Sequence, residues 1–136
     1  MNTAMNATIS PHLSCIVATY NAEKTLPILL ESLKKQNLQD IEIIFQDGGS
    51  KDGTVAILEK WRNVIPHLII HSAPDKGIYD AWNKALDHVN GKWVLFLGAD
   101  DTWVNSTSVD QALALLKALP DDATYLATPV AVVPHS

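Results

Sequence analysis

Two adjacent carboxylates, Asp100 and Asp101, follow a strongly apolar stretch at residues 92–97, a pattern that suits cation binding. Carboxylates held side by side repel each other unless a positive charge relieves them. Hard oxygen ligands favour Mg²⁺ or Mn²⁺, and Mg²⁺ usually combines one or two protein carboxylates with substrate phosphates and water. The pair therefore indicates a metal site, with a solvated turn that caps a helix as the alternative interpretation.

A second acidic segment, DGGSKDGT at residues 47–54, contains three glycines in eight residues. Glycine permits positive φ angles and a close approach of the backbone to a ligand. Asp47 can accept a hydrogen bond from a ligand N–H group, whereas Asp52 is placed to cap a following helix. An ordinary turn between a strand and a helix is the alternative interpretation.

A third segment, DKGIYD at residues 75–80, places Lys76 just before an expected helix. The free N–H groups and the dipole of a helix N-terminus attract phosphate. Lys76 would add a positive charge beside a diphosphate. A helix start with surface charges would have the same composition, so this segment alone is not specific.

The elements that must position these segments alternate along the chain. Continuous apolar runs predict buried strands at 13–18, 42–46, 67–71 and 92–97, with a last strand within 124–133. Apolar residues at helical spacing predict helices around 26–33, 55–61, 78–89 and 109–119. This order predicts an α/β fold with a mostly parallel, doubly wound sheet and helices on both faces.

In such a sheet, ligands bind beyond the carboxyl ends of the strands. This rule brings together four segments, at residues 19–23, 47–54, 74–80 and 98–102. The sequence lacks a G-x-G-x-x-G after the first strand, a P-loop and a G-x-S-x-G elbow. The common dinucleotide, NTPase and hydrolase sites are therefore not expected.

The composition narrows the class of partner. The chain carries 10 Lys and Arg against 15 Asp and Glu, a formal net charge of −5. This balance argues against a nucleic-acid partner bound through a broad basic face. No apolar run approaches the roughly 18–20 residues of a membrane span. A single cysteine, Cys15, excludes an intrachain disulfide and fits a reducing compartment.

The four segments, taken together and in order, resemble the family 2 glycosyltransferases of the Rossmann-like GT-A fold. The resemblance rests on CIVATYNAEKTL at 15–26, DGGSKDGT at 47–54, DKGIYDAWNKAL at 75–86 and GKWVLFLGADD at 91–101. The second and third of these segments are most similar to bacterial enzymes that build surface polysaccharides. The resemblance implies that a sugar is transferred, with inversion, from a nucleotide-diphosphate donor, often UDP-linked, to an acceptor hydroxyl.

The resemblance also implies a set of donor-binding residues: Thr19, Tyr20, Asn21, Glu23, Asp47, Asp75, Lys76, Gly77 and Asp100. The first three would line the nucleotide pocket, and the fourth would lie near the base or the ribose. Asp47 would meet a base N–H group, and residues 75–77 would flank the nucleotide or its phosphates.

A metal site is part of the same resemblance. Asp100 matches the last acid of the family's D-x-D motif, and Asp101 follows it. Gly98 replaces the first acid of the motif, so the metal contact would rest on Asp100, helped by Asp101. The implied cofactor is Mg²⁺ or Mn²⁺, which would act as a Lewis acid and neutralise the diphosphate leaving group.

The family's general base, an Asp or Glu in the C-terminal half, has no match in this sequence. The remaining acids toward the C-terminus are Asp110, Asp121 and Asp122, and none occupies the base position. We therefore expect a flexible leader at residues 1–10 and, at residues 11–136, the nucleotide-sugar-binding half of a truncated GT-A domain. The general base is expected beyond the C-terminus.

Two other hypotheses stay open at this point. A non-catalytic nucleotide-binding module would also lack the base. A nucleotidyltransferase-like enzyme would share the α/β core and an acidic metal site, but it usually has a glycine-rich, basic first loop. Residues 18–21, with the sequence ATYN, do not supply such a loop.

The resemblance implies two partners, a nucleotide-sugar donor and a saccharide or lipid-linked acceptor. The expected location is the cytoplasm, including peripheral association with the inner face of the membrane. The resemblance specifies neither the sugar nor the oligomeric state.

Overall fold

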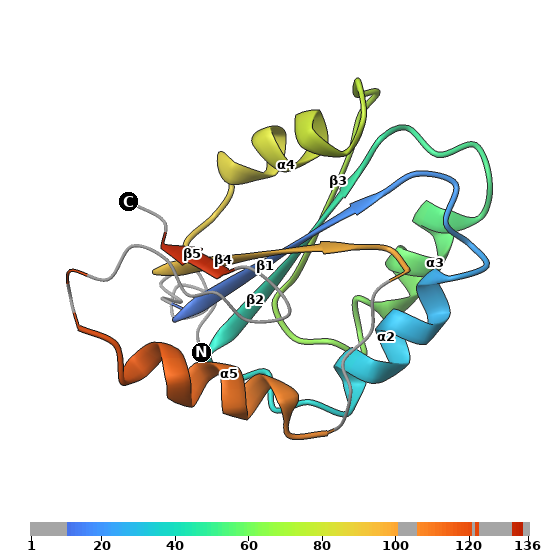
Figure 1. Ribbon diagram of the computed structural model, residues 1–136. Coiled ribbons are helices and arrows are strands. Elements are labelled where there is room, and N and C mark those ends of the chain that lie inside the picture. The colour runs from blue at the N-terminus through green and yellow to red at the C-terminus, as the bar shows by residue number, and fades with distance from the viewer. Residues whose placement is uncertain (1–10, 101–105, 121, 123–131, 135–136) are drawn as a thin grey trace, which may run out of the picture.

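The computed structural model describes residues 11–100, 106–120, 122 and 132–134, and within them five strands form one sheet in the order β3–β2–β1–β4–β5 (Figure 1). In chain order the elements are β1 (Leu13–Thr19), α2 (Leu26–Lys34), β2 (Ile41–Asp47), α3 (Thr54–Trp61), β3 (Leu68–Ser72), α4 (Ile78–Leu86), β4 (Trp93–Gly98), α5 (Ser108–Lys117) and β5 (Val132–Pro134). Strands β1 to β4 are parallel, and β5 is antiparallel to β4. The predicted α/β fold with a mostly parallel, doubly wound sheet is confirmed.

The two central strands explain why the sequence shows continuous apolar runs. Every residue of β2 is buried, and every residue of β1 except Ala18 is buried, because helices cover both faces of the sheet. The register pairs Thr19 with Asp47 and Asp47 with Ser72. The carboxyl ends of β1, β2 and β3 are therefore level, and each ends on a polar side chain.

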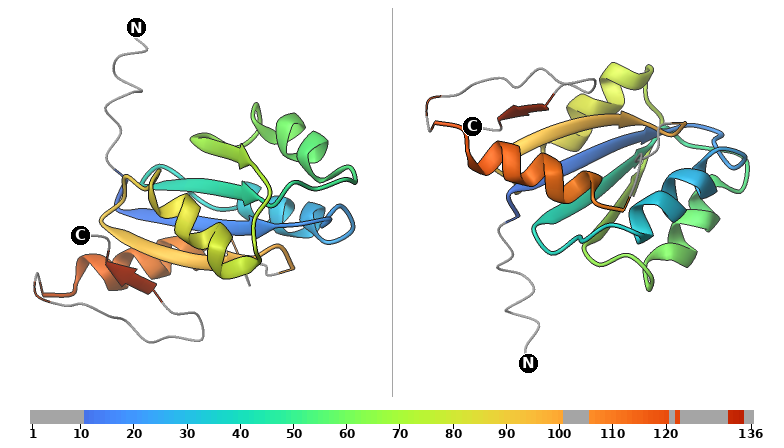
Figure 2. Two further views of the ribbon diagram at one scale, coloured as in Figure 1. Left: turned by 90° about the horizontal axis from the view of Figure 1, so that it is seen from above. Right: turned by 60° about the horizontal axis from the view of Figure 1, so that its bottom comes forward.

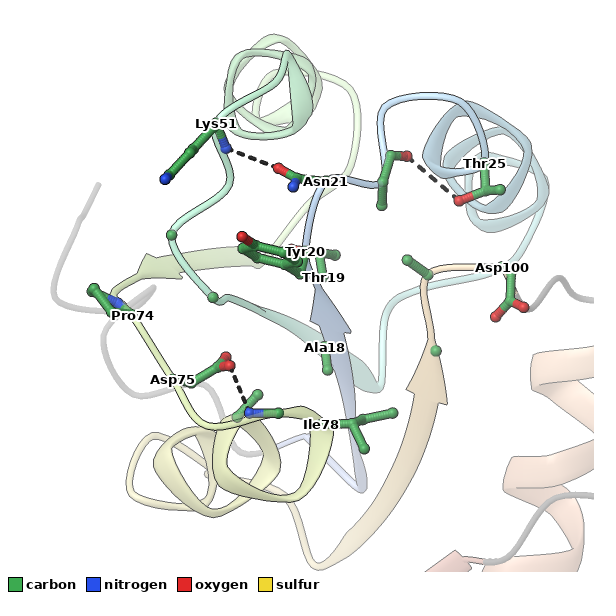
Figure 3. Close-up of a pocket in the computed structure, with 17 residues that line it drawn as sticks. Ala18, Thr19, Tyr20, Asn21, Thr25, Lys51, Pro74, Asp75, Ile78 and Asp100 are labelled. Carbon is green, nitrogen blue, oxygen red and sulfur yellow. Dashed lines mark hydrogen bonds between the residues drawn. The ribbon is translucent and has the colours of Figure 1, made fainter.

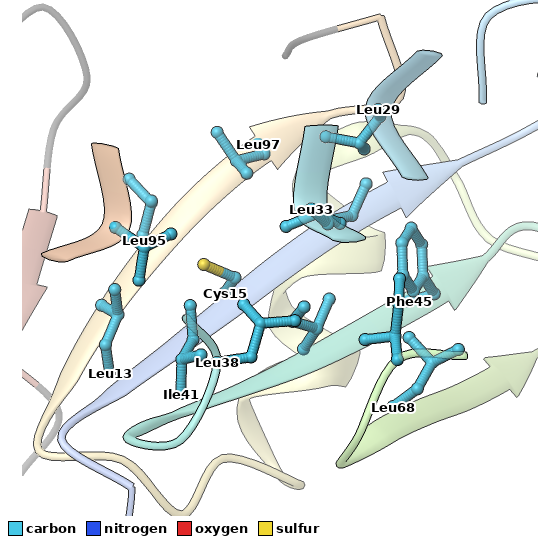
Figure 4. Packing of buried hydrophobic residues seen from close by; sticks show 14 of the residues in the cluster. Leu13, Cys15, Leu29, Leu33, Leu38, Ile41, Phe45, Leu68, Leu95 and Leu97 are labelled. Carbon is cyan, nitrogen blue, oxygen red and sulfur yellow. The ribbon is translucent and has the colours of Figure 1, made fainter. Parts of the chain in front are cut away.

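The two faces of the sheet carry unequal cover. Figure 2 shows α4 on one face and α2, α3 and α5 on the other. On the larger face, Cys15 and Phe45 belong to one buried cluster with Leu29 and Leu33 of α2 (Figure 4). Burying one such leucine contributes roughly 1.5–3 kcal/mol to the hydrophobic driving force. This cluster fixes α2 beneath the sheet.

On the smaller face, α4 is the one helix among the described residues. Ala85 of this helix lies in a second buried cluster with Ile16, Ile44 and Val94, one from each of the three central strands. The small alanine side chain lets the helix approach the sheet closely. As a result, the first turn of α4 is held beside the carboxyl ends of the strands.

Helix α4 ends at Leu86, short of the predicted end at residue 89, where the chain turns toward the amino end of β2. Glu42, buried in β2, accepts hydrogen bonds from the backbone N–H of Asn90 at 2.6 Å and from its Nδ2 at 3.1 Å. Ser14 Oγ donates to the same carboxylate at 2.5 Å and accepts from the Gly91 N–H at 2.9 Å. A Cβ on Gly91 would lie 2.5 Å from Ser14 Oγ, so the turn requires glycine.

Two of the sequence predictions fall near the ends of the chain. Strand β5 begins at Val132, and most of the predicted last strand at 124–133 lies outside the described residues, as does the predicted leader at 1–10. None of the described helices has the length and apolar character needed to cross a membrane.

Candidate functional site

A pocket of about 810 Å³ lies beyond the carboxyl ends of the strands (Figure 3). It is lined by parts of residues 18–25, 48–51, 74–81 and 98–100. The chain runs outward from β1 through β2 to β3 and then returns to place β4 on the other side of β1. The pocket therefore occupies the point where the strand order reverses, which is where ligands bind in open α/β sheets.

Asp47 anchors the loop after β2, which forms one wall of this pocket. Its carboxylate is fully buried and accepts five hydrogen bonds. Oδ1 accepts from Thr19 Oγ1 at 2.7 Å and Ser50 Oγ at 2.6 Å. Oδ2 accepts from the N–H groups of Gly49 at 3.0 Å and Ser50 at 2.8 Å, and from Ser72 Oγ at 2.9 Å. One side chain thus joins the ends of three strands to the loop after β2.

The hydrogen bonds to Asp47 also determine its charge. Burial by itself would raise the pKa of this carboxyl, but the bonds from Ser50, Thr19 and Ser72 outweigh burial and hold the pKa below its ordinary value. Asp47 is therefore ionised at neutral pH. It does not line the pocket, so its contact with a base N–H group stays a prediction.

The loop after β1 is docked onto the loop after β2. Asn21 has a positive φ of 48°, a conformation that asparagine tolerates better than most residues. Its N–H donates to Ser50 Oγ at 2.8 Å, and its Oδ1 accepts from the Lys51 N–H at 2.9 Å. Thr19, Tyr20 and Asn21 all line the pocket, and Tyr20 is 58% exposed. An aromatic ring is thereby presented to the cavity.

Glu23 joins the same two loops from outside the pocket lining. Its Oε2 accepts from the Gly53 N–H at 3.2 Å, and its own N–H donates to Asp52 Oδ2 at 3.3 Å. Its place beside a base or ribose stays a prediction.

The predicted role of Asp52 as the cap of α3 is wrong, because Gly53 occupies the cap position. Asp52 Oδ1 instead accepts a hydrogen bond from the Thr54 N–H at 3.0 Å.

The loop between β3 and α4 forms the opposite wall. Asp75 and Gly77 line the pocket, and Asp75 Oδ1 accepts from the Gly77 N–H at 3.0 Å. A φ of 122° at Gly77 favours glycine at this position. Lys76 is exposed and does not line the pocket. The position of its positive charge beside a diphosphate stays a prediction.

Asp75 lies against the loop after β2. A Cβ on Gly48 would come within 2.6 Å of Asp75 Oδ2, so glycine at this position leaves room for the carboxylate. Gly48 is buried and donates its own N–H to the Thr19 carbonyl at 2.9 Å. Two of the predicted segments therefore touch through Asp75 and Gly48.

Asp100 lies at the end of β4 and lines the pocket with an exposed carboxylate. Figure 3 shows it across the pocket from Asp75. Asp101, the second predicted metal ligand, lies outside the described residues. The part of the chain that the structure describes holds no group of three or more His, Cys, Asp or Glu suited to a metal ion.

The chemistry of the pocket fits a hard divalent cation that arrives with its ligand. The charged residues among those that line it are Lys51, Asp75 and Asp100. A diphosphate would meet two carboxylates and one ammonium group, so it requires a further positive charge. Asp100 supplies an oxygen ligand of the kind that Mg²⁺ and Mn²⁺ accept, with phosphate and water completing the shell.

Two functional side chains, Ser50 and Ser72, were not singled out by the sequence analysis. Both hydroxyls bind the Asp47 carboxylate, and Ser72 is its register partner in β3. The sequence does show a polar residue at the end of each neighbouring strand. That pattern predicts a contact between these residues only when the register of the strands is known.

Comparison with known proteins supports the arrangement. A sequence model described as glycosyl transferase family 2 matches residues 14–133. A PGL/p-HBAD biosynthesis glycosyltransferase from Mycobacterium bovis is 37% identical over 118 residues, which are 85% of this chain and 46% of that protein. The poly(ribitol-phosphate) beta-N-acetylglucosaminyltransferase TarS of Staphylococcus aureus is 35% identical over 106 residues, 76% of this chain and 18% of TarS.

Solved structures show the same fold. The crystal structure of S. aureus TarS 1-349 in complex with UDP-GlcNAc matches with a TM-score of 0.75 at 26% identity, over 90% of this chain and 45% of that chain. The mannosyltransferase PcManGT from Pyrobaculum calidifontis, solved with GDP-Man and Mn²⁺, has a TM-score of 0.77 at 22% identity, over 93% and 45%. The chain thus spans less than half the length of each of these relatives.

Proposed function

Because the chain belongs to the family 2 glycosyltransferases, we propose that it forms the donor-binding half of an enzyme that transfers a sugar from a nucleotide diphosphate to an acceptor hydroxyl. The observation that carries this proposal is the pocket at the strand-order reversal. All four segments of the family resemblance contribute to its lining. We assign residues 11–136 to this donor-binding part.

The residues divide the donor between two ends of the pocket. Tyr20, Asn21 and Asp75 would hold the base and ribose, with an aromatic face and polar atoms suited to a nucleoside. Asp47 and Glu23 fix the loops on this side, and Asp47 would meet a base N–H group. The diphosphate would extend toward Asp100. Lys76 and Gly77 complete the proposed donor site.

A divalent cation, Mg²⁺ or Mn²⁺, belongs to the proposal. Asp100 would hold it, with Asp101 as a second ligand. When bound, the cation neutralises charge on the leaving diphosphate. The protein's own contribution is to orient the donor: the Asp47 network holds the loop after β2, and the wall around Asp75 closes the other side.

The finer parts of the proposal concern the donor, stereochemistry and location. A UDP-linked donor is supported by the 26% identity to TarS, whose structure was solved with UDP-GlcNAc. Inversion and a saccharide or lipid-linked acceptor follow from the family resemblance. A cytoplasmic location is supported by the free, buried Cys15, which fits a reducing compartment. Association with the inner face of the membrane follows from the family resemblance.

Titration calorimetry with UDP, GDP and TDP tests the proposal on the 136-residue chain, each with and without Mn²⁺. We expect heat with at least one nucleotide, most strongly with UDP, and weaker binding when Mn²⁺ is omitted. Asp100→Ala should remove the Mn²⁺ dependence. Asp87→Ala, at an exposed acid after α4, is the matched control. Absence of heat with all three nucleotides would refute the proposal.

A transfer assay tests whether the chain by itself supports turnover. The chain is incubated with UDP-sugars and saccharide or lipid-linked acceptors, and release of UDP is measured. Release of UDP that depends on the acceptor supports an active transferase. Binding without release is the result expected both of a donor-binding half that lacks the general base and of a non-catalytic nucleotide-binding module.

A further inference from the structure

The pocket wall that carries Asp75 is tied to α4 by two side chains of the helix itself. Lys84 Nζ donates a hydrogen bond to the Pro74 carbonyl at 2.6 Å. Asp80 Oδ2 accepts from the Lys76 N–H at 2.9 Å. The two side chains also meet, with Lys84 Nζ 3.4 Å from Asp80 Oδ2. We call this pair, Asp80 and Lys84, the α4 clamp.

The α4 clamp holds the backbone on both sides of Asp75. The carbonyl of the residue before it and the N–H of the residue after it are both bound. The Asp75 side chain is restrained separately, by the Gly77 N–H at 3.0 Å and by the close approach to Gly48. Asp75 therefore has little freedom to move relative to the helix.

Neither member of the clamp lines the pocket. Their side chains are only partly exposed, at 38% for Lys84 and 33% for Asp80. Their spacing, with the acid four residues before the lysine, is that of an ordinary helix-stabilising ion pair. What distinguishes this pair is that both members also reach the loop, and the lysine reaches back ten residues to do so.

We propose that Asp80 and Lys84 are positioning residues for nucleotide binding, because they hold Asp75 in the place where it meets the donor. This inference rests on the proposed function of the pocket. The clamp touches no ligand and acts through Asp75. It also makes α4 part of the binding site, although its Ala85 belongs to the buried cluster on the smaller face of the sheet.

The test is a double-mutant cycle between Lys84 and Asp75, read by the dissociation constant for UDP or GDP with Mn²⁺, whichever binds the unmodified chain more tightly. Lys84→Met keeps the aliphatic stem and removes the donor, and should weaken binding about tenfold. Lys84→Arg restores a donor and should recover binding to within about threefold. In an Asp75→Asn background, Lys84→Met should add less than about twofold.

The matched control is Lys34→Met, an exposed lysine in the last turn of α2. It makes the same chemical change in another helix and should leave the dissociation constant unchanged. Thermal unfolding of each variant is measured in parallel. A pair that only stabilises its helix would lower the unfolding temperature of Lys84→Met without changing the affinity measured below that temperature, and this result would overturn the proposal.

A second readout judges the clamp without any ligand. Hydrogen exchange of the free chain reports opening of the loop, because the Lys76 and Gly77 N–H groups are both bonded in it. We expect faster exchange at these two amides in Lys84→Met and not in Lys34→Met. If the unmodified chain bound no nucleotide, the proposed function would fall, while faster exchange would still support the clamp as a restraint on Asp75. Unchanged hydrogen exchange in Lys84→Met would refute the proposal, and so would unchanged affinity. An equal loss of affinity when Lys84→Met is made in the Asp75→Asn background would also refute it.

Discussion

Each end of β2 carries a buried carboxylate that orders the neighbouring loop, but a tight turn forms at one end and a pocket at the other. At the carboxyl end, buried Asp47 accepts hydrogen bonds from hydroxyls and loop N–H groups, and at the amino end buried Glu42 does the same. The turn beside Glu42 closes tightly onto Ser14 through Gly91. The loop beside Asp47 meets the loop after β3 at Gly48 and Asp75, and the pocket lies between these two loops and the loop after β4.

This difference comes from topology rather than from the buried carboxylates. At the carboxyl end, the chain leaves β1 and β4 in opposite directions, so their loops diverge. A smaller hollow of about 620 Å³ exists at the amino end, lined in part by Asn90 and Gly91, but Glu42 does not line it. A buried carboxylate therefore orders a loop, whereas the strand order decides whether that loop borders a binding site.

Removing Asp47 should have the largest effect. Asp47→Ala leaves five donors without their acceptor, so we expect a loss of about 3–4 kcal/mol in the free energy of unfolding. Nucleotide binding should disappear with it, because the loop at 48–50 loses its anchor. Urea denaturation and calorimetry with UDP and Mn²⁺ measure the two losses. Retention of wild-type affinity in the folded variant would contradict the role given to Asp47.

Removing Glu42 tests the other half of the comparison. Glu42→Ala leaves the Asn90 N–H and the Ser14 hydroxyl unsatisfied, and we expect a loss of about 2–3 kcal/mol. Affinity for UDP should stay within about twofold, because the amino-end turn does not touch the pocket. A large loss of affinity at a temperature where the variant is folded would show that the two ends are coupled.

Two glycine substitutions sharpen the same contrast. In Gly91→Ala the new Cβ would meet backbone, 2.7 Å from the Ser14 nitrogen, so we expect a loss of about 2 kcal/mol and unchanged affinity. In Gly48→Ala the three atoms nearest the new Cβ belong to the Asp75 side chain, which can turn aside if it gives up its hydrogen bond from the Gly77 N–H. This variant should lose less than about 1 kcal/mol but bind UDP several-fold more weakly. A larger loss of stability in Gly48→Ala than in Gly91→Ala would refute the different roles given to the two ends of β2. A larger loss of affinity in Gly91→Ala than in Gly48→Ala would refute them as well.

The smallest expected effect is a pH dependence at the stacked pair His71 and His88, whose ring centroids are 3.8 Å apart. Burial, then the neighbouring charges of His88 and Arg62, hold the pKa of His71 below its ordinary value. The unfolded chain takes up a proton as the pH falls below about 6.5, before the folded chain does, so stability should decrease there.

Substitution of the ring tests the source of that pH dependence. His71→Phe should flatten the decrease in unfolding free energy between pH 7 and 5, followed by urea denaturation. His67→Asn is the control, because His67 has a positive φ of 57° that asparagine tolerates. An equal flattening in the control would place the titration elsewhere.

Much of the fold could be predicted because each central strand is buried on both faces and so reads as an apolar run. The early end of α4 could not, since the bond between Asn90 and Glu42 joins residues 48 apart in sequence. The pattern of apolar residues continues to Val89, and only the sheet places the acceptor that turns the chain away.

The site shows the same division. The rule for open α/β sheets brings four segments together, and Tyr20, Asp75 and Asp100 of these segments line one pocket. The role of Asp47 as a loop anchor depends on Ser72, which reaches it only through the strand register. The clamp on α4 was invisible because an acid and a lysine four residues apart are common on helix surfaces.

The single thiol of the chain has a practical consequence. Cys15 is fully buried against the leucines of the larger face, and burial raises its pKa, so reagents that attack thiolates do not reach it (Figure 4). A cysteine introduced at the exposed Ala73 would then be labelled alone. A fluorophore at that point, beside Asp75, would report movement of the pocket wall in the otherwise unaltered chain.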